Sequence, residues 1–186
     1  MAEGMVLWRR VDQPGHEAAR VVRDGDRWRL EGTAVFAHEG RPCRLDYRLV
    51  CEDDWRFVHG RVSGWMGGRE VAHEVQVDGS GCWWLDGEEV AEVEGCVDFD
   101  LNFSPSTNLL PIRRLGLDVG EEAEASAAWL RFPSFQLERL DQVYRRTGPA
   151  AYRYETTDGA FARDLDVDEA GLVTRYPEQW EAERVA

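Results

Sequence analysis

The chain has 186 residues, the size of one domain with a single core, so we expect one domain over residues 1–186. Its 36 acidic residues outnumber its 22 basic ones and give a formal net charge of −14, which argues against nucleic acid and anionic membrane surfaces as partners. No segment approaches the run of about 18 apolar residues that a membrane-spanning helix needs. We therefore expect a cytoplasmic protein with no stable membrane insertion.

Cysteine and histidine spacing predicts neither a metal site nor a cofactor site. The cysteines form no CxxC pair, and the histidines form no HExxH or other paired spacing; they are Cys43, Cys51, Cys82, Cys96, His16, His38, His59 and His73. We expect the cysteines to be reduced and to fill the core as small apolar side chains.

Apolar and polar residues alternate with period two along most of the chain, which is typical of half-buried strands. Clear examples are Leu45, Tyr47, Leu49 and Cys51, and then Val71, His73, Val75 and Val77. Turn signals separate such runs at Asp24-Gly25, Glu39-Gly40, Asp78-Gly79, Asp86-Gly87, Asp158-Gly159 and Asp168 to Gly171. Residues 137–146 fit either a helix or a strand. The pattern favours an all-β antiparallel meander, with one curved sheet forming a roll or half-barrel; a β-sandwich is the alternative.

Polar chemistry is densest between Gly95 and Leu115. Asp98, Asp100 and Asn102 alternate with apolar residues, so an extended chain places these three on one face. A turn with Thr107 and Asn108 follows, and then Arg113 and Arg114. The acids either bind the hydroxyl groups of a ligand or pair with the arginines, which bind carboxylates bidentately.

The chain is rich in tryptophan, with eight in all. Trp83 and Trp84 are adjacent, so one of them points away from the core in any strand. The large aromatic side chains, including Trp83, Tyr144 and Tyr154, either fill the core or line a binding cavity.

These residues resemble the bacterial family called Putative glycolipid-binding, formerly a domain of unknown function. The main signature is Cys96-x-Asp98-x-Asp100 followed by Pro105-x-Thr107-Asn108-x-Leu110-Pro111-Ile112-Arg113-Arg114-Leu115. Further matches are Trp8, Gly15, Glu17, Trp55, Asp78-Gly79-x-Gly81-x-Trp83, Gln142-x-Tyr144, Tyr152-x-Tyr154, Phe161, Gly171-Leu172-Val173 and Tyr176-Pro177. The resemblance implies an all-β spiral or half-barrel with little helix, similar to bacterial lipoprotein carriers, and a cavity that holds a glycolipid.

The predicted function is therefore non-enzymatic binding or carriage of an amphipathic ligand, a glycolipid, in a β-roll cavity. The predicted ligand-binding residues are Asp98, Asp100, Asn102, Thr107, Asn108, Arg113, Arg114, Trp83, Tyr144 and Tyr154. No catalytic residue is assigned. A homodimer is possible, although the sequence does not locate the long unpaired edge strand that would form it.

Two alternatives stay open. A hydrolase acting on a glycoconjugate would use Asp98 and Asp100, with Glu17 as another acid, because paired carboxylates drive glycoside hydrolysis. A scaffold with no small ligand would have an interior filled by side chains.

Overall fold

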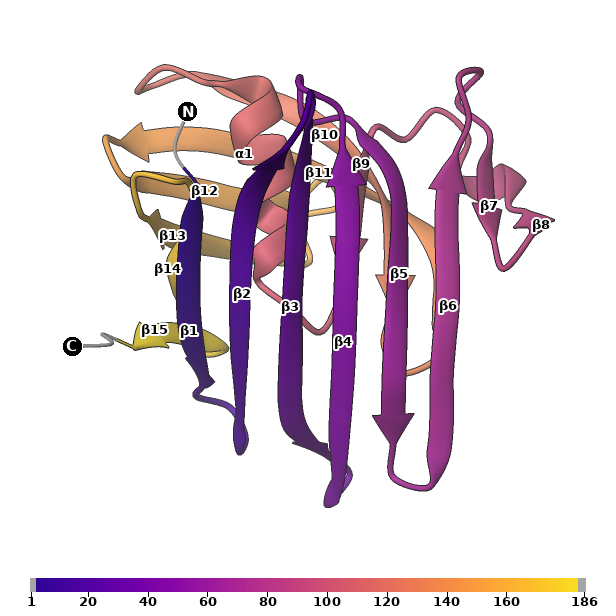
Figure 1. Cartoon of the computed structure of the whole chain (residues 1–186). Coiled ribbons are helices and arrows are strands. Elements are labelled where there is room, and N and C mark those ends of the chain that lie inside the picture. The colour runs from indigo at the N-terminus through magenta and orange to yellow at the C-terminus, as the bar shows by residue number, and fades with distance from the viewer. Residues whose placement is uncertain (1–2, 184–186) are drawn as a thin grey trace.

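The computed structural model describes residues 3–183 and confirms the all-β class, with one large curved sheet and little helix (Figure 1). The sheet has 15 strands in the order β8-β7-β6-β5-β4-β3-β2-β1-β15-β14-β13-β12-β11-β10-β9. Every neighbouring pair is antiparallel except β9 with β10, which is parallel. The meander predicted from the alternation is therefore the main architecture.

The first half of the chain forms the layer nearest the viewer in Figure 1. Its strands are β1 (Gly4–Arg10), β2 (Gly15–Asp24), β3 (Arg27–His38), β4 (Arg41–Cys51), β5 (Phe57–Met66) and β6 (Arg69–Val77). Short turns join them, and the turn at Glu39 and Gly40 has positive φ at both residues, as two-residue hairpins favour.

The second half forms the layer behind, and β15 pairs with β1 so that the two halves make one sheet. Its strands are β10 (Glu122–Arg131), β11 (Gln136–Gly148), β12 (Ala151–Thr156), β13 (Ala162–Val167), β14 (Val173–Tyr176) and β15 (Trp180–Glu183). Residues 137–146 lie in β11, which confirms the strand alternative for that segment and excludes the helix.

The middle of the chain crosses between the halves. It contains β7 (Trp83–Leu85), β8 (Glu88–Glu89), η1 (Ala91–Val93), β9 (Asp98–Leu101), η2 (Ser106–Asn108) and α1 (Leu109–Leu115). The short helix α1 was not predicted. It has Pro111 in its first turn, where a missing N–H breaks no helical hydrogen bond, and it ends at Gly116 in the left-handed region. Its apolar residues are buried, and Figure 1 shows it behind β2 and β3, between the layers.

Large side chains fill the space between the layers. Trp8, Trp55 and Trp83 are fully buried, and Phe57 stacks between Trp83 and Phe99. Cys43, Cys51 and Cys96 are buried as expected, whereas Cys82 is only partly buried, and all four are free thiols. Within residues 3–183, no helix is long and apolar enough to span a bilayer.

Gly32 in β3 supplies the space that fixes the position of Tyr47. A Cβ at residue 32 would lie 2.4 Å from the Tyr47 hydroxyl and 2.8 Å from the Ala18 carbonyl oxygen. Tyr47 is held by a hydrogen bond to buried Glu17, so it cannot simply swing away. We expect Gly32→Ala to lower the free energy of unfolding by about 1–3 kcal/mol, as overpacking does. Urea denaturation measures this, and an unchanged midpoint relative to a Gly79→Ala control, where a Cβ meets open space, would contradict it.

Candidate functional site

A cavity of about 230 Å³ lies where the Asp98 to Arg114 segment meets the second half of the sheet. It is lined by residues from β9, η2, β10, β11, β12, β14, β15 and the loops beside them. They are Asp100, Leu101, Asn102, Ser104, Pro105, Asn108, Trp129, Leu140, Tyr154, Thr156, Phe161, Tyr176, Gln179 and Trp180. Segments up to 80 positions apart in the sequence thus build one small pocket of acidic, amide and aromatic groups, which we call the motif cavity.

Asp100 is the acidic group of the motif cavity. It lies in β9 opposite Trp129 of β10, and its side chain is only partly buried because it faces the cavity. Desolvation raises its pKa to about 7, although a hydrogen bond from Thr107 acts in the opposite direction. At neutral pH this carboxyl group can therefore both accept and donate hydrogen bonds.

Aromatic side chains form the walls. Tyr154 contacts Phe161 and Tyr176, with ring centroids 5.8 Å and 6.5 Å apart. Burial raises the pKa of both tyrosines, and the charge of nearby Asp100 raises it further, so their hydroxyl groups remain protonated donors. Trp129 is partly exposed at this site, whereas Trp180 is buried.

The turn before α1 is fixed by hydrogen bonds of its polar side chains. The Asn108 amide donates to the Pro105 carbonyl oxygen at 3.1 Å, and the Tyr144 hydroxyl donates to Asn108 Oδ1 at 2.9 Å. Thr107 Oγ1 accepts a hydrogen bond from the Leu101 N–H at 3.1 Å. Thr107 and Tyr144 do not line the cavity, but they fix the positions of Leu101 and Asn108, which do.

Asp98 and Arg114 form a bidentate ion pair beside the motif cavity. The guanidinium donates to the two carboxylate oxygens at 2.9 Å and 2.6 Å, and the Asp98 side chain is only 1% exposed. Desolvation raises the pKa of Asp98, while Arg114 opposes this effect. Asp98 is not among the residues that line the cavity, so Asp98 and Asp100 do not converge on one ligand position. Of the two roles considered for the acids, Asp98 therefore has the second one, pairing with an arginine.

The ten predicted site residues therefore separate into groups. Asp100, Asn102, Asn108 and Tyr154 line the motif cavity. Arg113 lies over the Trp55 ring at 5.6 Å, and Trp83 is buried with its indole N–H bonded to the Cys96 carbonyl oxygen. Neither side chain lines the motif cavity: Trp83 is part of the core, and Arg113 is a partly buried residue packed on Trp55.

A buried polar cluster adjoins the cavity through Ser104. The Ser104 hydroxyl donates to Glu17 Oε1 at 2.5 Å, the Tyr47 hydroxyl donates to the same oxygen at 2.6 Å, and Ser106 bonds Ser104 at 2.7 Å. Desolvation raises the pKa of Glu17 to about 7. The sequence pointed to this cluster only through Glu17, which is among the residues that resemble the family; in β2 it shares a strand face with buried Ala19 and Val21.

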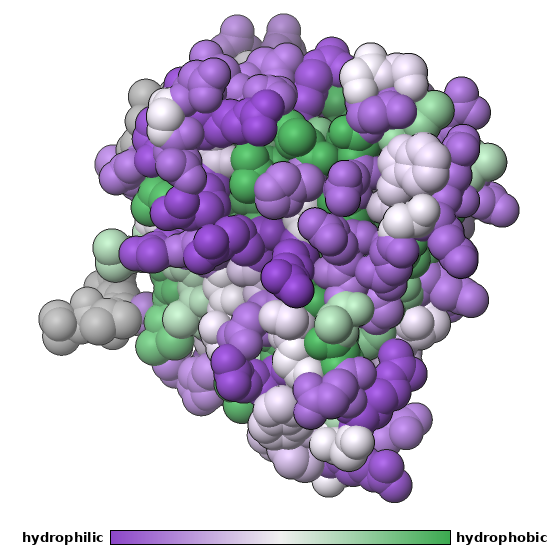
Figure 2. All heavy atoms as spheres, turned by 45° about the vertical axis from the view of Figure 1, so that its right-hand side comes forward, coloured by the Kyte–Doolittle hydropathy of each residue, from purple (hydrophilic) through white to green (hydrophobic). Residues whose placement is uncertain are grey.

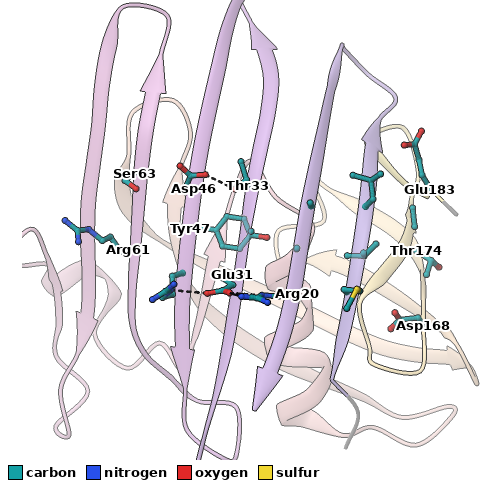
Figure 3. A pocket seen from close by; sticks show the side chains of 18 of the residues that line it. Arg20, Glu31, Thr33, Asp46, Tyr47, Arg61, Ser63, Asp168, Thr174 and Glu183 are labelled. Atoms are coloured by element: carbon teal, nitrogen blue, oxygen red, sulfur yellow. Dashed lines mark hydrogen bonds and ion pairs between the residues drawn. The ribbon is translucent and has the colours of Figure 1, made fainter. Parts of the chain in front are cut away.

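A larger trough of about 1200 Å³ lies on the outer face of β1 to β6 (Figure 3). Its floor includes Thr33, which donates to Asp46 at 2.7 Å. Beside it, Glu31 pairs with Arg20 at 2.5 Å and with Arg48 at 3.1 Å. Figure 2 shows hydrophilic residues over most of one face of the molecule, with hydrophobic residues visible between them. Among the described residues, the trough therefore combines a neutralised group, Glu31 with its two arginines, and the unpaired Arg61.

The motif cavity offers a carboxyl group, amides, hydroxyl groups and aromatic faces within a volume of about 230 Å³. Hydroxyl groups of a sugar match the hydrogen-bonding groups, and aromatic faces match the apolar side of a sugar ring. Among residues 3–183, no group of three or more His, Cys, Asp or Glu side chains could hold a metal ion.

Comparisons with known proteins agree with this fold. A crystal structure of a DUF1089 family protein from Pseudomonas aeruginosa superposes with a TM-score of 0.76 at 33% identity, covering 89% of this chain and 91% of that one. No curated protein matches the chain. The model of the family described as Putative glycolipid-binding matches residues 5–182, which include every residue of the motif cavity. The chain therefore belongs to the Putative glycolipid-binding family.

Proposed function

We propose that the protein binds a glycolipid without chemical turnover and holds a sugar of the headgroup in the motif cavity. The observation that carries this proposal is the partly exposed Asp100 carboxyl group among Asn108, Tyr154 and Tyr176. The family membership supports a binding role for the chain. In this proposal Asp100 and Asn108 bind sugar hydroxyl groups, and the aromatic walls contact the ring.

The size of the motif cavity limits what it can enclose. Its volume of about 230 Å³ is below the range of roughly 300–1,000 Å³ that is usual for sites enclosing a whole small molecule. The cavity therefore takes the headgroup alone. The lipid part of the ligand extends out of the cavity on its exposed side, where Asn102 and Trp129 lie.

The alternative function, a hydrolase acting on a glycoconjugate, would release free sugar. Asp98 is neutralised by Arg114 and does not line the motif cavity, so the Asp98–Asp100 pair offers only one carboxyl group to a ligand there. Glycosidases of the usual kind need two carboxyl groups flanking the bond that breaks. Binding without turnover is the function that this arrangement supports best.

A panel of octyl glycosides that differ only in the sugar tests the proposal by isothermal titration calorimetry. We expect at least one glycoside to bind, and Asp100→Asn and Tyr154→Phe each to weaken that binding by about tenfold, the effect of losing one charge-assisted or buried hydrogen bond. Asp164→Asn is the matched control, because that side chain is 74% exposed and lies outside the cavity.

Two results would contradict this function. Equal weakening by the Asp164 control, or no binding of any glycoside, would remove the motif cavity as the sugar site. Release of free sugar by the wild type, lost in Asp100→Asn, would establish the hydrolase instead.

A further inference from the structure

Three hairpin tips meet at one end of the molecule and border a second, open cavity of about 510 Å³. The tips are those of β3 and β4, β5 and β6, and β10 and β11. The cavity is lined by His38, Glu39, Arg41, Met66, Gly67, Arg69, Arg131, Pro133, Ser134, Gln136 and Glu138. It shares no lining residue with the motif cavity, so the two cavities are separate sites.

Each hairpin contributes one arginine to this cavity. Arg41 begins β4 after the turn at Glu39 and Gly40, and Arg69 begins β6 after the turn at Gly67 and Gly68. Arg131 ends β10 before the third turn. Two-residue hairpins have little conformational freedom, so the positions of Arg41 and Arg69 are fixed by the sheet.

The first two tips are also fastened to each other. The Gly67 N–H donates to the Pro42 carbonyl oxygen at 3.0 Å. A Cβ at residue 67 would lie 3.1 Å from Arg41 Cδ, so the Arg41 side chain extends across the space that this glycine leaves open. The Arg69 guanidinium lies 5.9 Å from the centre of the Phe135 ring of the third tip. These contacts direct guanidinium groups from separate hairpins toward one space.

Arg41 and Arg69 differ from most arginines of the chain in their charge partners. Among the described residues, neither has a carboxylate within ion-pair distance, whereas Arg131 pairs with Glu138 at 3.1 Å. Glu39 is the other acid of the cavity and lies at the turn. The lining residues carry three arginines against two acids in a protein of net charge −14, so this cavity is locally cationic.

We propose that the hairpin-tip cavity binds a phosphate monoester, with Arg41 and Arg69 as its two anchoring groups. Planar guanidinium groups match phosphate oxygens in a bidentate way, and two unpaired guanidinium groups balance the two charges of a monoester. His38, Ser134 and Gln136 add further hydrogen-bonding groups, and the volume leaves room for the organic part of the ester. The monoester is carried either by a soluble metabolite or by the headgroup of a lipid.

The binding test uses glycerol 3-phosphate, inorganic phosphate and vesicles of phosphatidic acid, with phosphatidylcholine vesicles as the comparison. We expect wild-type binding of glycerol 3-phosphate, and a loss of about tenfold or more in affinity for Arg41→Gln and for Arg69→Gln. Arg61→Gln is the matched control. Arg61 is also exposed without a carboxylate partner among the described residues, but it lines the outer trough instead. Binding to phosphatidic acid vesicles alone would identify the lipid as the source of the monoester.

The proposal is overturned if the wild type binds none of the monoester probes. It is equally overturned if Arg61→Gln weakens binding as much as Arg41→Gln, because general surface charge would then account for it. Circular dichroism melting shows whether each variant is folded. If Arg41→Gln does not fold, the conservative variant Arg41→Lys replaces it in the binding test. Binding of octyl glycosides at the motif cavity is measured in the same variants, so failure of one site is distinguishable from failure of the other.

Discussion

Replacing Arg114 by methionine is expected to lower the free energy of unfolding by about 3–5 kcal/mol, the usual effect of leaving one partner of a buried ion pair alone. Asp98 is 1% exposed and the Arg114 side chain only 18% exposed, so water cannot replace the lost guanidinium. The variant retains an unbranched side chain that covers part of the same apolar surface. Urea denaturation at neutral pH measures the change.

A double variant separates the ion pair from simple packing. In Arg114→Met with Asp98→Leu, no charge remains buried, and we expect most of the lost stability to return. Arg145→Met is the control, because its pair with Glu122 has both side chains more than half exposed and should contribute no more than about 1 kcal/mol. If Arg114→Met changed stability no more than this control, the pair would have no structural role.

Glu17→Gln is expected to change how stability depends on pH. Burial raises the pKa of Glu17 from 4.5 to about 7. Below pH of about 4.5 the group is protonated in both states and has no effect on stability. As the pH rises toward about 7, the unfolded chain releases the proton more readily than the folded one, so this group destabilises the fold. The full effect above pH 7 is about 3 kcal/mol.

Glutamine imitates the protonated acid at this position, because Oε1 can still accept hydrogen bonds from Tyr47 and Ser104. Oε2 has no hydrogen-bond partner among residues 3–183, so the amide group there replaces no existing bond. We expect the variant to gain stability relative to the wild type as pH rises from about 5 to about 8, and the difference to disappear at the acidic end. Parallel pH profiles of the two proteins in urea denaturation would show that Glu17 does not titrate in this range.

The strands could be predicted from the sequence because alternation with period two is a local property. Tyr47 and Leu49 lie on the core face of β4, and turn residues such as Glu39 and Gly40 mark where the chain reverses. The chemistry of the motif cavity was also partly local, because Asp100, Asn102 and Asn108 lie within one short segment. Their shared cavity is consistent with the prediction that this segment carries the site.

The helix α1 was not predicted because its seven residues give too little periodicity to distinguish it from an irregular segment. The sequence also left open whether Asp98 and Asp100 pair with arginines or face a ligand. Asp98 and Asp100 share one face of a strand, yet Arg114 reaches only Asp98, and Asp100 meets tyrosines that come from β12 and β14.

By itself, the sequence determined the all-β class, several of the turns and the segment with the densest polar chemistry, since propensity and alternation depend on near neighbours. Only the tertiary structure decided that Glu17 meets Ser104, 87 residues away, and that Arg41, Arg69 and Arg131 surround one cavity. The order of strands in the sheet brings such residues together. That order depends on how both halves bury their apolar faces at once, which no single segment specifies.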